Sequence, residues 1–203
     1  MSSSAPKTRE LTEEILARFD ATREARGLLA PGLGPSEFVS ALLERELWAD
    51  AAGFVGQWLG KVDAVTWACL ASKKALAPDA PKEERAALEA AERWAKAPGE
   101  EARRACAAAA EALTYGSAPA MAAAAAGWSG GSLSLPDLPP VPPPANLTGT
   151  GAAGAVLMSA AAGAPDVAGR LRELVWLGVG LAEGRRRPAA GGREEPPRAE
   201  REG

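Results

Sequence analysis

The side chains that most often carry out catalysis are scarce in this sequence. Its 203 residues include no histidine, a single tyrosine and two cysteines. This removes most of the groups that move protons, bind transition metals or attack electrophiles. Zinc usually takes four ligands, and two cysteines without histidine cannot supply them. The composition therefore favours a protein without catalytic residues, metal or cofactor over an enzyme that would have to use carboxylates and lysines alone.

The two cysteines, Cys69 and Cys106, lie in alanine-rich stretches with helical character. One unpatterned pair is not a disulfide framework, and structural disulfides belong mainly to oxidising compartments. We expect two reduced, buried thiols, and the alternative is a disulfide between neighbouring helices.

The pattern Gly-x-Gly-x-x-Gly occurs at residues 149–154. In dinucleotide-binding proteins this pattern lies between a strand and a helix, so that the pyrophosphate meets backbone N–H groups. Here it follows the proline-rich residues 139–144, which cannot form a central parallel strand. We predict that these glycines allow helices to pack closely and that they bind no nucleotide.

Ser72, followed by Lys73 and Lys74, could be read as a serine–lysine nucleophile. That chemistry needs both groups on one helix face, and a spacing of one or two residues does not place them there. We expect the lysines to lie at the C-terminal end of a helix, where cations are favoured.

The tryptophans are the remaining candidates for a site. Aromatic residues at helical spacing are usually core residues, which predicts burial of Trp58, Trp67, Trp94 and Trp176. Trp128 differs because it begins a segment without a helical pattern. It either anchors that segment on the body of the protein or lines a binding surface.

The elements that would position these residues are helices. Apolar residues recur at helical spacing, no segment alternates with a period of two, and glycine and proline separate the segments. One helix is expected to begin at Thr12, and the others to cover residues 37–48, 50–59, 62–76, 82–97, 100–115, 118–128, 147–163 and 166–183. We predict an all-α fold: a compact bundle of eight or nine short helices in antiparallel hairpins.

Residues 11–184 are expected to form a single helical domain, preceded by a disordered N-terminus at 1–10. Residues 185–203 consist mostly of Arg, Glu, Gly and Pro and lack apolar anchors, which predicts a disordered tail.

Within the domain, residues 129–146 form a proline-rich surface loop, whose residues 139–144 should follow an extended polyproline II path. A connection of this length inside a compact domain is either functional or disordered. We predict that it binds a protein partner, with its apolar side chains covering the helical core as the alternative. The candidate residues are Trp128, Leu133, Leu135, Leu138, Pro139, Pro140, Val141, Pro142 and Pro143.

The formal charge of −3 offers no basic face for nucleic acid. No apolar run approaches the ~20 residues of a membrane span, and the first ten residues do not resemble a signal peptide. We therefore expect a cytoplasmic protein that binds neither nucleic acid nor metal and does not cross a membrane.

Two stretches resemble a family of uncharacterised, mostly proteobacterial helical proteins. Residues 63–71, Asp-Ala-Val-Thr-Trp-Ala-Cys-Leu-Ala, are similar to that family's Ala-Val-Trp-Trp-Ala segment, with Thr66 in place of its first tryptophan. Residues 128–133, Trp-Ser-Gly-Gly-Ser-Leu, with the prolines that follow, are similar to its loop. The likeness extends over residues 35–183. Some members are encoded beside type VI secretion genes, so the resemblance implies an adaptor or accessory role.

Three functions follow from these observations. The first is a cytoplasmic interaction protein that acts as an adaptor or accessory factor. The others are a carrier that holds a small hydrophobic ligand in a pocket lined by Trp58 and Trp67, and an enzyme that uses carboxylates. The scarcity of catalytic side chains and the proline-rich loop favour the first.

The composition of the C-terminal segment generates a testable prediction. Removal of residues 185–203 should leave the melting temperature almost unchanged, because the segment carries no apolar side chains that could pack on the body. Thermal unfolding followed by circular dichroism measures this. A fall of several degrees would show that the segment packs against the helices.

Overall fold

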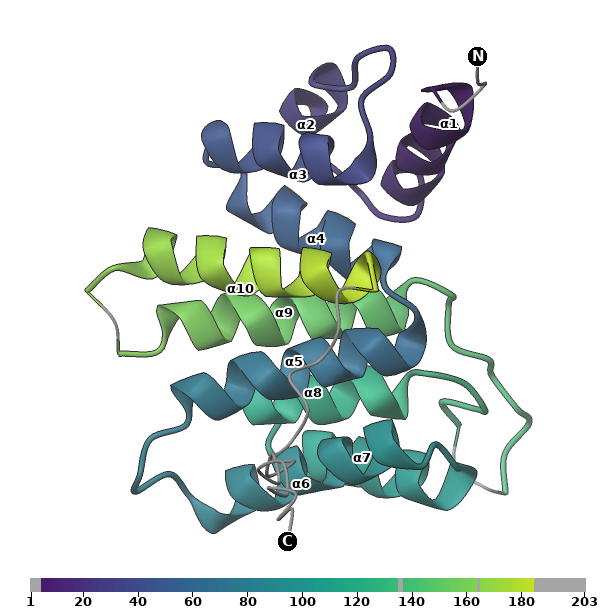
Figure 1. Cartoon of the computed structure of the whole chain (residues 1–203). Helices are drawn as coiled ribbons and strands as arrows, with labels where there is room; N and C mark the ends of the chain where they lie inside the picture. The colour runs from purple at the N-terminus through teal and green to yellow at the C-terminus, as the bar shows by residue number, and fades with distance from the viewer. Residues whose placement is uncertain (1–4, 135–136, 164, 185–203) are drawn as a thin grey trace, which may run out of the picture.

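The computed structural model describes residues 5–134, 137–163 and 165–184. The predicted tail, residues 185–203, lies outside this range. Ten helices and no strand occur among the described residues, which confirms the all-α prediction (Figure 1). The helices are α1 Ala5–Leu16, α2 Arg23–Gly27, α3 Pro35–Glu44, α4 Trp48–Trp58, α5 Lys61–Ala75, α6 Lys82–Lys96, α7 Glu100–Ala112, α8 Ala118–Gly127, α9 Leu147–Ala161 and α10 Val167–Ala182.

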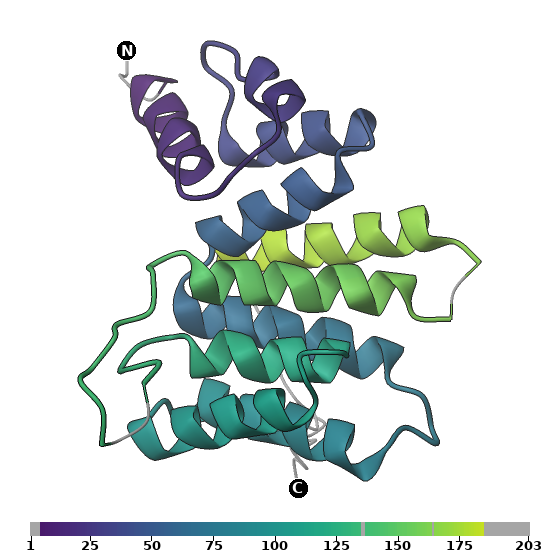
Figure 2. The ribbon, with the colours of Figure 1, turned by 180° about the vertical axis from the view of Figure 1, so that it is seen from behind.

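The helices are stacked in layers along the long axis of the molecule. Helices α1 to α3 form one end, α4 lies beneath them, and α9 with α10, α5 with α8, and α6 with α7 follow (Figures 1 and 2). Helix α8 is the most enclosed and contacts α5, α6, α7 and α9. Residues 129–146, called the strap below, leave the end of α8 and return to the start of α9 along one side of this stack (Figure 1).

Two of the C-terminal helices begin at residues whose side chains cap them. The Ser117 side chain accepts a hydrogen bond from the backbone N–H of Ala120 and begins α8. The Asp166 side chain accepts one from Gly169 and begins α10. Asn146 holds the cap position of α9, but its side chain makes no capping bond.

The prediction for the N-terminal segment was wrong about the start of the first helix, and it missed the short helix that follows. Helix α1 begins at Ala5 instead of Thr12, so part of the segment expected to be disordered is helical. The Thr12 hydroxyl donates to the carbonyl of Leu33 at 3.0 Å, a contact between distant segments. Helix α2 was not predicted. Thr22 caps it and donates from both its N–H and its hydroxyl to the buried Asp50, at 2.8 Å each.

The boundary between α3 and α4 also differs from the prediction. Helix α3 begins at Pro35, two residues before the predicted start, and the Glu37 carboxylate accepts from the backbone N–H of Gly34 at 2.8 Å. The break comes at Glu46, which has φ +58°, so Trp48 begins α4 instead of ending α3.

The core contains some of the predicted tryptophans. Trp67 is completely buried, its indole N–H donates to the Leu174 carbonyl at 2.7 Å, and Trp94 is also buried. Trp58 is half-buried. The prediction for Trp176 was wrong: it is 38% exposed, because α10 covers the bundle with its other face, which carries Leu174.

Close packing of small residues explains the glycine pattern of α9. A Cβ atom on Gly149 would lie 2.5 Å from the carbonyl oxygen of Gly56 in α4. One on Gly151 would lie 3.1 Å from the Cα of Ala125 in α8. These distances confirm the prediction of close helix packing. The pattern lies inside α9, and no strand precedes it among the described residues.

Replacement of glycine by alanine should have opposite effects on stability at a packed position in α4 and at an open position in α10. Gly56→Ala should destabilise the protein by about 2–3 kcal/mol, because its methyl group would meet the backbone of α9. Gly180→Ala in α10 should stabilise it by about 0.5–1 kcal/mol, because nothing lies within 4 Å of the added Cβ and alanine is the better helix former. Urea unfolding of both variants measures the two changes. Equal effects would contradict the packing argument.

Candidate functional site

The start of the strap is held by a cluster of charged side chains. Arg103 on α7 is 4% exposed and donates to the carbonyl oxygens of Gly127 at 2.5 Å and Ser132 at 3.3 Å. Its guanidinium group also pairs with both carboxylate oxygens of Glu100, at 2.7 and 2.8 Å. One buried cation therefore fixes the end of α8 and the first turn of the strap.

A glycine lies directly on this ion pair. Gly131 has φ +63°, and a Cβ atom there would lie 2.8 Å from both Arg103 Nε and Glu100 Oε2. The Ser-Gly-Gly-Ser turn thus needs glycine for its backbone conformation and for space.

Polar contacts hold the rest of the strap. Lys61 Nζ donates to the Ser129 carbonyl at 2.6 Å, and Gln57 Nε2 donates to the Asn146 carbonyl at 3.0 Å. The two arms are joined to each other, since Val141 donates to Ser132 Oγ at 2.9 Å and its carbonyl accepts from Leu133 at 2.8 Å. The strap is thereby held at both ends and across its middle.

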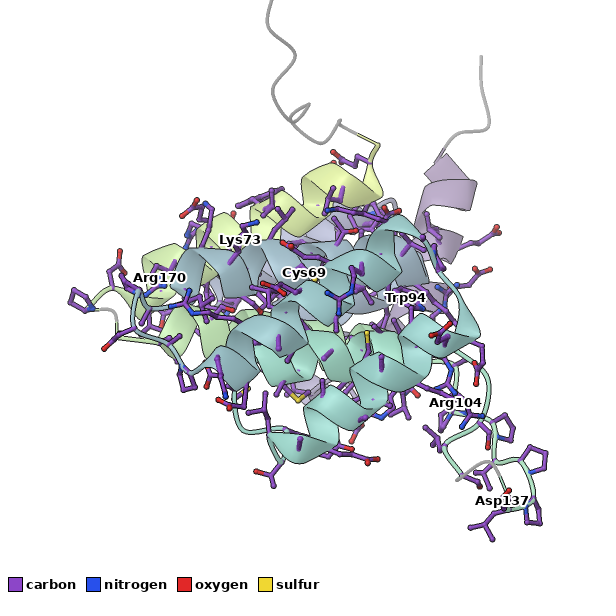
Figure 3. All side chains as sticks on the ribbon, turned by 90° about the horizontal axis from the view of Figure 1, so that it is seen from below. Cys69, Lys73, Trp94, Arg104, Asp137 and Arg170 are labelled. Carbon is purple, nitrogen blue, oxygen red and sulfur yellow. The ribbon has the colours of Figure 1, made fainter. Side chains whose placement is uncertain are left out.

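The predicted partner-binding residues divide into two groups. Trp128 is half-buried against the core and stacks on Tyr115, with ring centroids 5.7 Å apart. Leu133, Leu138 and Val141 are 44%, 57% and 51% exposed. Pro139, Pro140 and Pro142 are exposed and Pro143 is half-buried, whereas Leu135 lies outside the described residues. The strap extends away from the helices, with Asp137 far from the body and Arg104 near its base (Figure 3).

Three cavities among the described residues bear on a possible binding site. The smallest, about 170 Å³, lies between α7, the end of α8 and the strap, and its walls include Arg104, Tyr115 and Trp128. A second, about 440 Å³, lies where α4 ends and where α5 and α9 begin, with Arg18, Gln57 and Lys61 in its wall. The third, about 470 Å³, lies beside the loop between α5 and α6.

Two of these cavities include a buried hydroxyl without a hydrogen-bond partner among the described residues. These are Thr148 Oγ1 at the second cavity and Ser72 Oγ at the third. An unpartnered buried hydroxyl costs about 1–3 kcal/mol, so each marks a position where a ligand or water would be stabilised.

The other candidate groups have structural explanations. Burial raises the pKa of Cys69 to about 12 and that of Cys106 to about 11, and both are free thiols, as expected. Lys73 pairs with Glu92 at 3.2 Å and Lys74 pairs with Glu173, near the C-terminal end of α5.

Within the described part of the chain, no group of three His, Cys, Asp or Glu side chains is placed to hold a metal ion. None of the helices described there has the length and apolar character that a membrane span needs.

Sequence reasoning missed the polar residues that hold the strap. Arg103 lies in an alanine-rich amphipathic helix, where an arginine is usually solvated. Two features of the sequence could have indicated the role of Arg103. Glu100 precedes it by three residues, which places both side chains on one face of the helix. The Ser-Gly-Gly-Ser turn also marks a segment whose backbone carbonyls have no partners within a helix. Gln57 and Lys61 gave no comparable signal.

Comparison with known proteins places the chain in a family. Residues 38–182 match the model of DUF6931, a family of unknown function, and the chain belongs to that family. No curated protein and no solved structure matches it. The match includes α4 to α10 and the strap, but α1 and α2 lie outside it.

The Glu100–Arg103 pair generates a prediction about pH. Hydrogen bonds from Arg103 lower the pKa of Glu100 from 4.5 to about 2. The ionised carboxylate therefore contributes stability that is complete above pH 4.5 and is lost as the pH falls towards 2. Glu100→Gln should lower the melting temperature by a few degrees at pH 7, and the difference from wild type should shrink below pH 4.5.

Glu101→Gln is the matched control for this prediction, because Glu101 is also exposed in the first turn of α7. Its effect should be smaller and should vary less with pH. A Glu100→Gln difference that stays constant from pH 7 to pH 3 would show that the pair does not contribute through the carboxylate charge.

Proposed function

We propose that the protein is a non-enzymatic interaction protein, an adaptor or accessory factor, and that the strap binds its partner. The observation that carries this proposal is the exposure of Leu133, Leu138 and Val141 on a backbone that polar contacts hold in place.

The length of the strap supports this role. Helices α8 and α9 pack against each other, and neighbouring helices in a bundle are usually joined by about 2–8 residues. Here residues 128–146 separate them. The topology does not require so long a connection, so the additional residues need another explanation.

The way the strap is held also favours a binding role over a covering role. Its contacts to the body are made by Arg103, Lys61 and Gln57, which donate to backbone carbonyls. Three apolar side chains of the strap, Leu133, Leu138 and Val141, are instead about half exposed. Side chains that served to cover the core would be buried.

The chemistry of the strap indicates the kind of partner. Proline-rich segments lose little entropy on binding and are recognised by grooves lined with aromatic side chains. A partner with such a groove would receive Leu138, Val141 and the prolines around them. Because hydrogen bonds from Lys61, Arg103 and Gln57 hold the two ends of the strap, less ordering of these ends would be needed on binding.

The alternative functions have less support. A carrier would need a pocket lined by Trp58 and Trp67, but neither side chain lines any of the three cavities described above. An enzyme using carboxylates would need them to converge, and the buried carboxylate Asp50 is used to fix Thr22. We also propose that the protein acts in the cytoplasm. Its resemblance to a family with some members encoded beside type VI secretion genes favours an accessory role near such a secretion system.

Site-specific crosslinking tests this proposal. A photoreactive amino acid at Leu138 should capture a partner in cells. The same group at Val167, which is also exposed but begins α10 at the opposite side of the bundle, should not (Figure 1). The captured partner can then be purified for direct binding measurements.

With that partner, Leu138→Ser combined with Val141→Ser should weaken binding at least about tenfold, because apolar contacts in the groove are lost. Val167→Ser should bind as wild type, and both variants should unfold cooperatively at the wild-type temperature. If the double variant binds normally, the interaction site lies elsewhere. If it unfolds, the strap is structural.

A further inference from the structure

The cavity of about 440 Å³ is separate from the outward side chains of the strap and has chemistry of its own. It lies where α4 ends and where α5 and α9 begin, and its wall includes Gly56, Gln57, Gly60, Thr148 and Gly149. Arg18, from the segment after α1, and Lys61, the first residue of α5, add two cations.

Two helix N-termini meet at this cavity. Helices α5 and α9 have 15 residues each, and neither has a side chain that accepts a hydrogen bond at its N-cap. The first N–H groups of a helix lack partners within the helix and carry partial positive charge. Anions bind favourably at such ends.

The two cationic side chains are not neutralised. Arg18 donates to the Gln57 carbonyl at 3.1 Å, and Lys61 donates to the Ser129 carbonyl at 2.6 Å. Among the described residues neither forms an ion pair with a carboxylate. One carboxylate, Asp63, lies in the first turn of α5, where its Oδ2 would be 4.0 Å from a Cβ on Gly60, but it does not line the cavity.

A buried hydroxyl provides an independent indication of a ligand. Thr148 is 2% exposed and lines the cavity, and its Oγ1 has no hydrogen-bond partner among the described residues. The remaining wall is partly apolar, with Leu59, Ala64 and Ala145. The cavity is also larger than a bare inorganic anion requires.

We propose that this cavity binds a small organic anion. Its phosphate or carboxylate head group would lie between Arg18, Lys61 and the starts of α5 and α9, and its apolar part would lie against Leu59 and Ala64. This ligand site does not depend on the partner proposed for the strap.

Isothermal titration of the full-length protein with three matched compounds tests the proposal. Phenyl phosphate and benzoate carry the two head groups on the same ring, and phenol is the neutral control. At least one of the two anions should bind saturably, and phenol should not. The anion that binds identifies the head group. The proposal is overturned if neither anion binds, or if phenol binds equally well.

Substitutions locate the binding. Arg18→Gln and Lys61→Gln should each weaken it at least about tenfold, because each removes a charge-assisted hydrogen bond. Lys82→Gln should have no effect, because that lysine is exposed at the start of α6 and does not line the cavity. Equal affinity in all three variants would show that binding occurs elsewhere and would overturn the assignment.

Thr148→Val tests the buried hydroxyl with little change in shape. It should weaken anion binding without lowering the melting temperature, because the hydroxyl has no partner to lose within the protein. The Leu138→Ser and Val141→Ser double variant should bind the anion as wild type. Loss of anion binding in that variant would contradict a site separate from the outward face of the strap.

Discussion

The close approach of α9 to α4 at Gly149 and Gly56 is the constraint on which the rest of the structure depends. Each glycine occupies space that a Cβ atom would need, so the two backbones lie against each other. The same principle continues where Gly151 meets Ala125 and Gly127 meets Ala107. It allows α8, whose residues are all buried except Met121, to lie between four other helices.

A core built this way buries little apolar area per residue, so a few large side chains carry a disproportionate share. Trp67 is the largest of the completely buried ones. It fits only because Gly178 leaves room, since a Cβ atom there would lie 2.8 Å from the indole ring. Its N–H donates to the Leu174 carbonyl, so the same residue also joins α5 to α10 by a hydrogen bond. Glycine positions and large side chains are thus matched to each other across the bundle.

Much of the fold could be predicted because the helix boundaries are local features. Ser117 and Asp166 cap the helices that follow them, and the separators between α6 and α7 are the proline and glycine at positions 98 and 99. The short helix α2 could not be predicted, because the residue that stabilises its cap, Asp50, lies 28 positions away. Trp176 was misassigned for a related reason: helical spacing shows that α10 has an apolar face but not how far the neighbouring helices cover it.

The candidate site could be predicted only in part, because the contacts that hold it join residues distant in the sequence. Composition identified the strap, but the residues that hold it, Arg103 and Gln57, lie on helices distant in sequence and act on backbone carbonyls that have no sequence signature. Lys61 is a further case. It donates to Ser129 at the start of the strap and also lines the cavity between α5 and α9. The Lys61 ammonium group has three N–H donors, so one of them can donate to the Ser129 carbonyl while another donates to an anion in the cavity. One exposed lysine can therefore serve both the strap and the cavity, and neither role has a signature in the sequence.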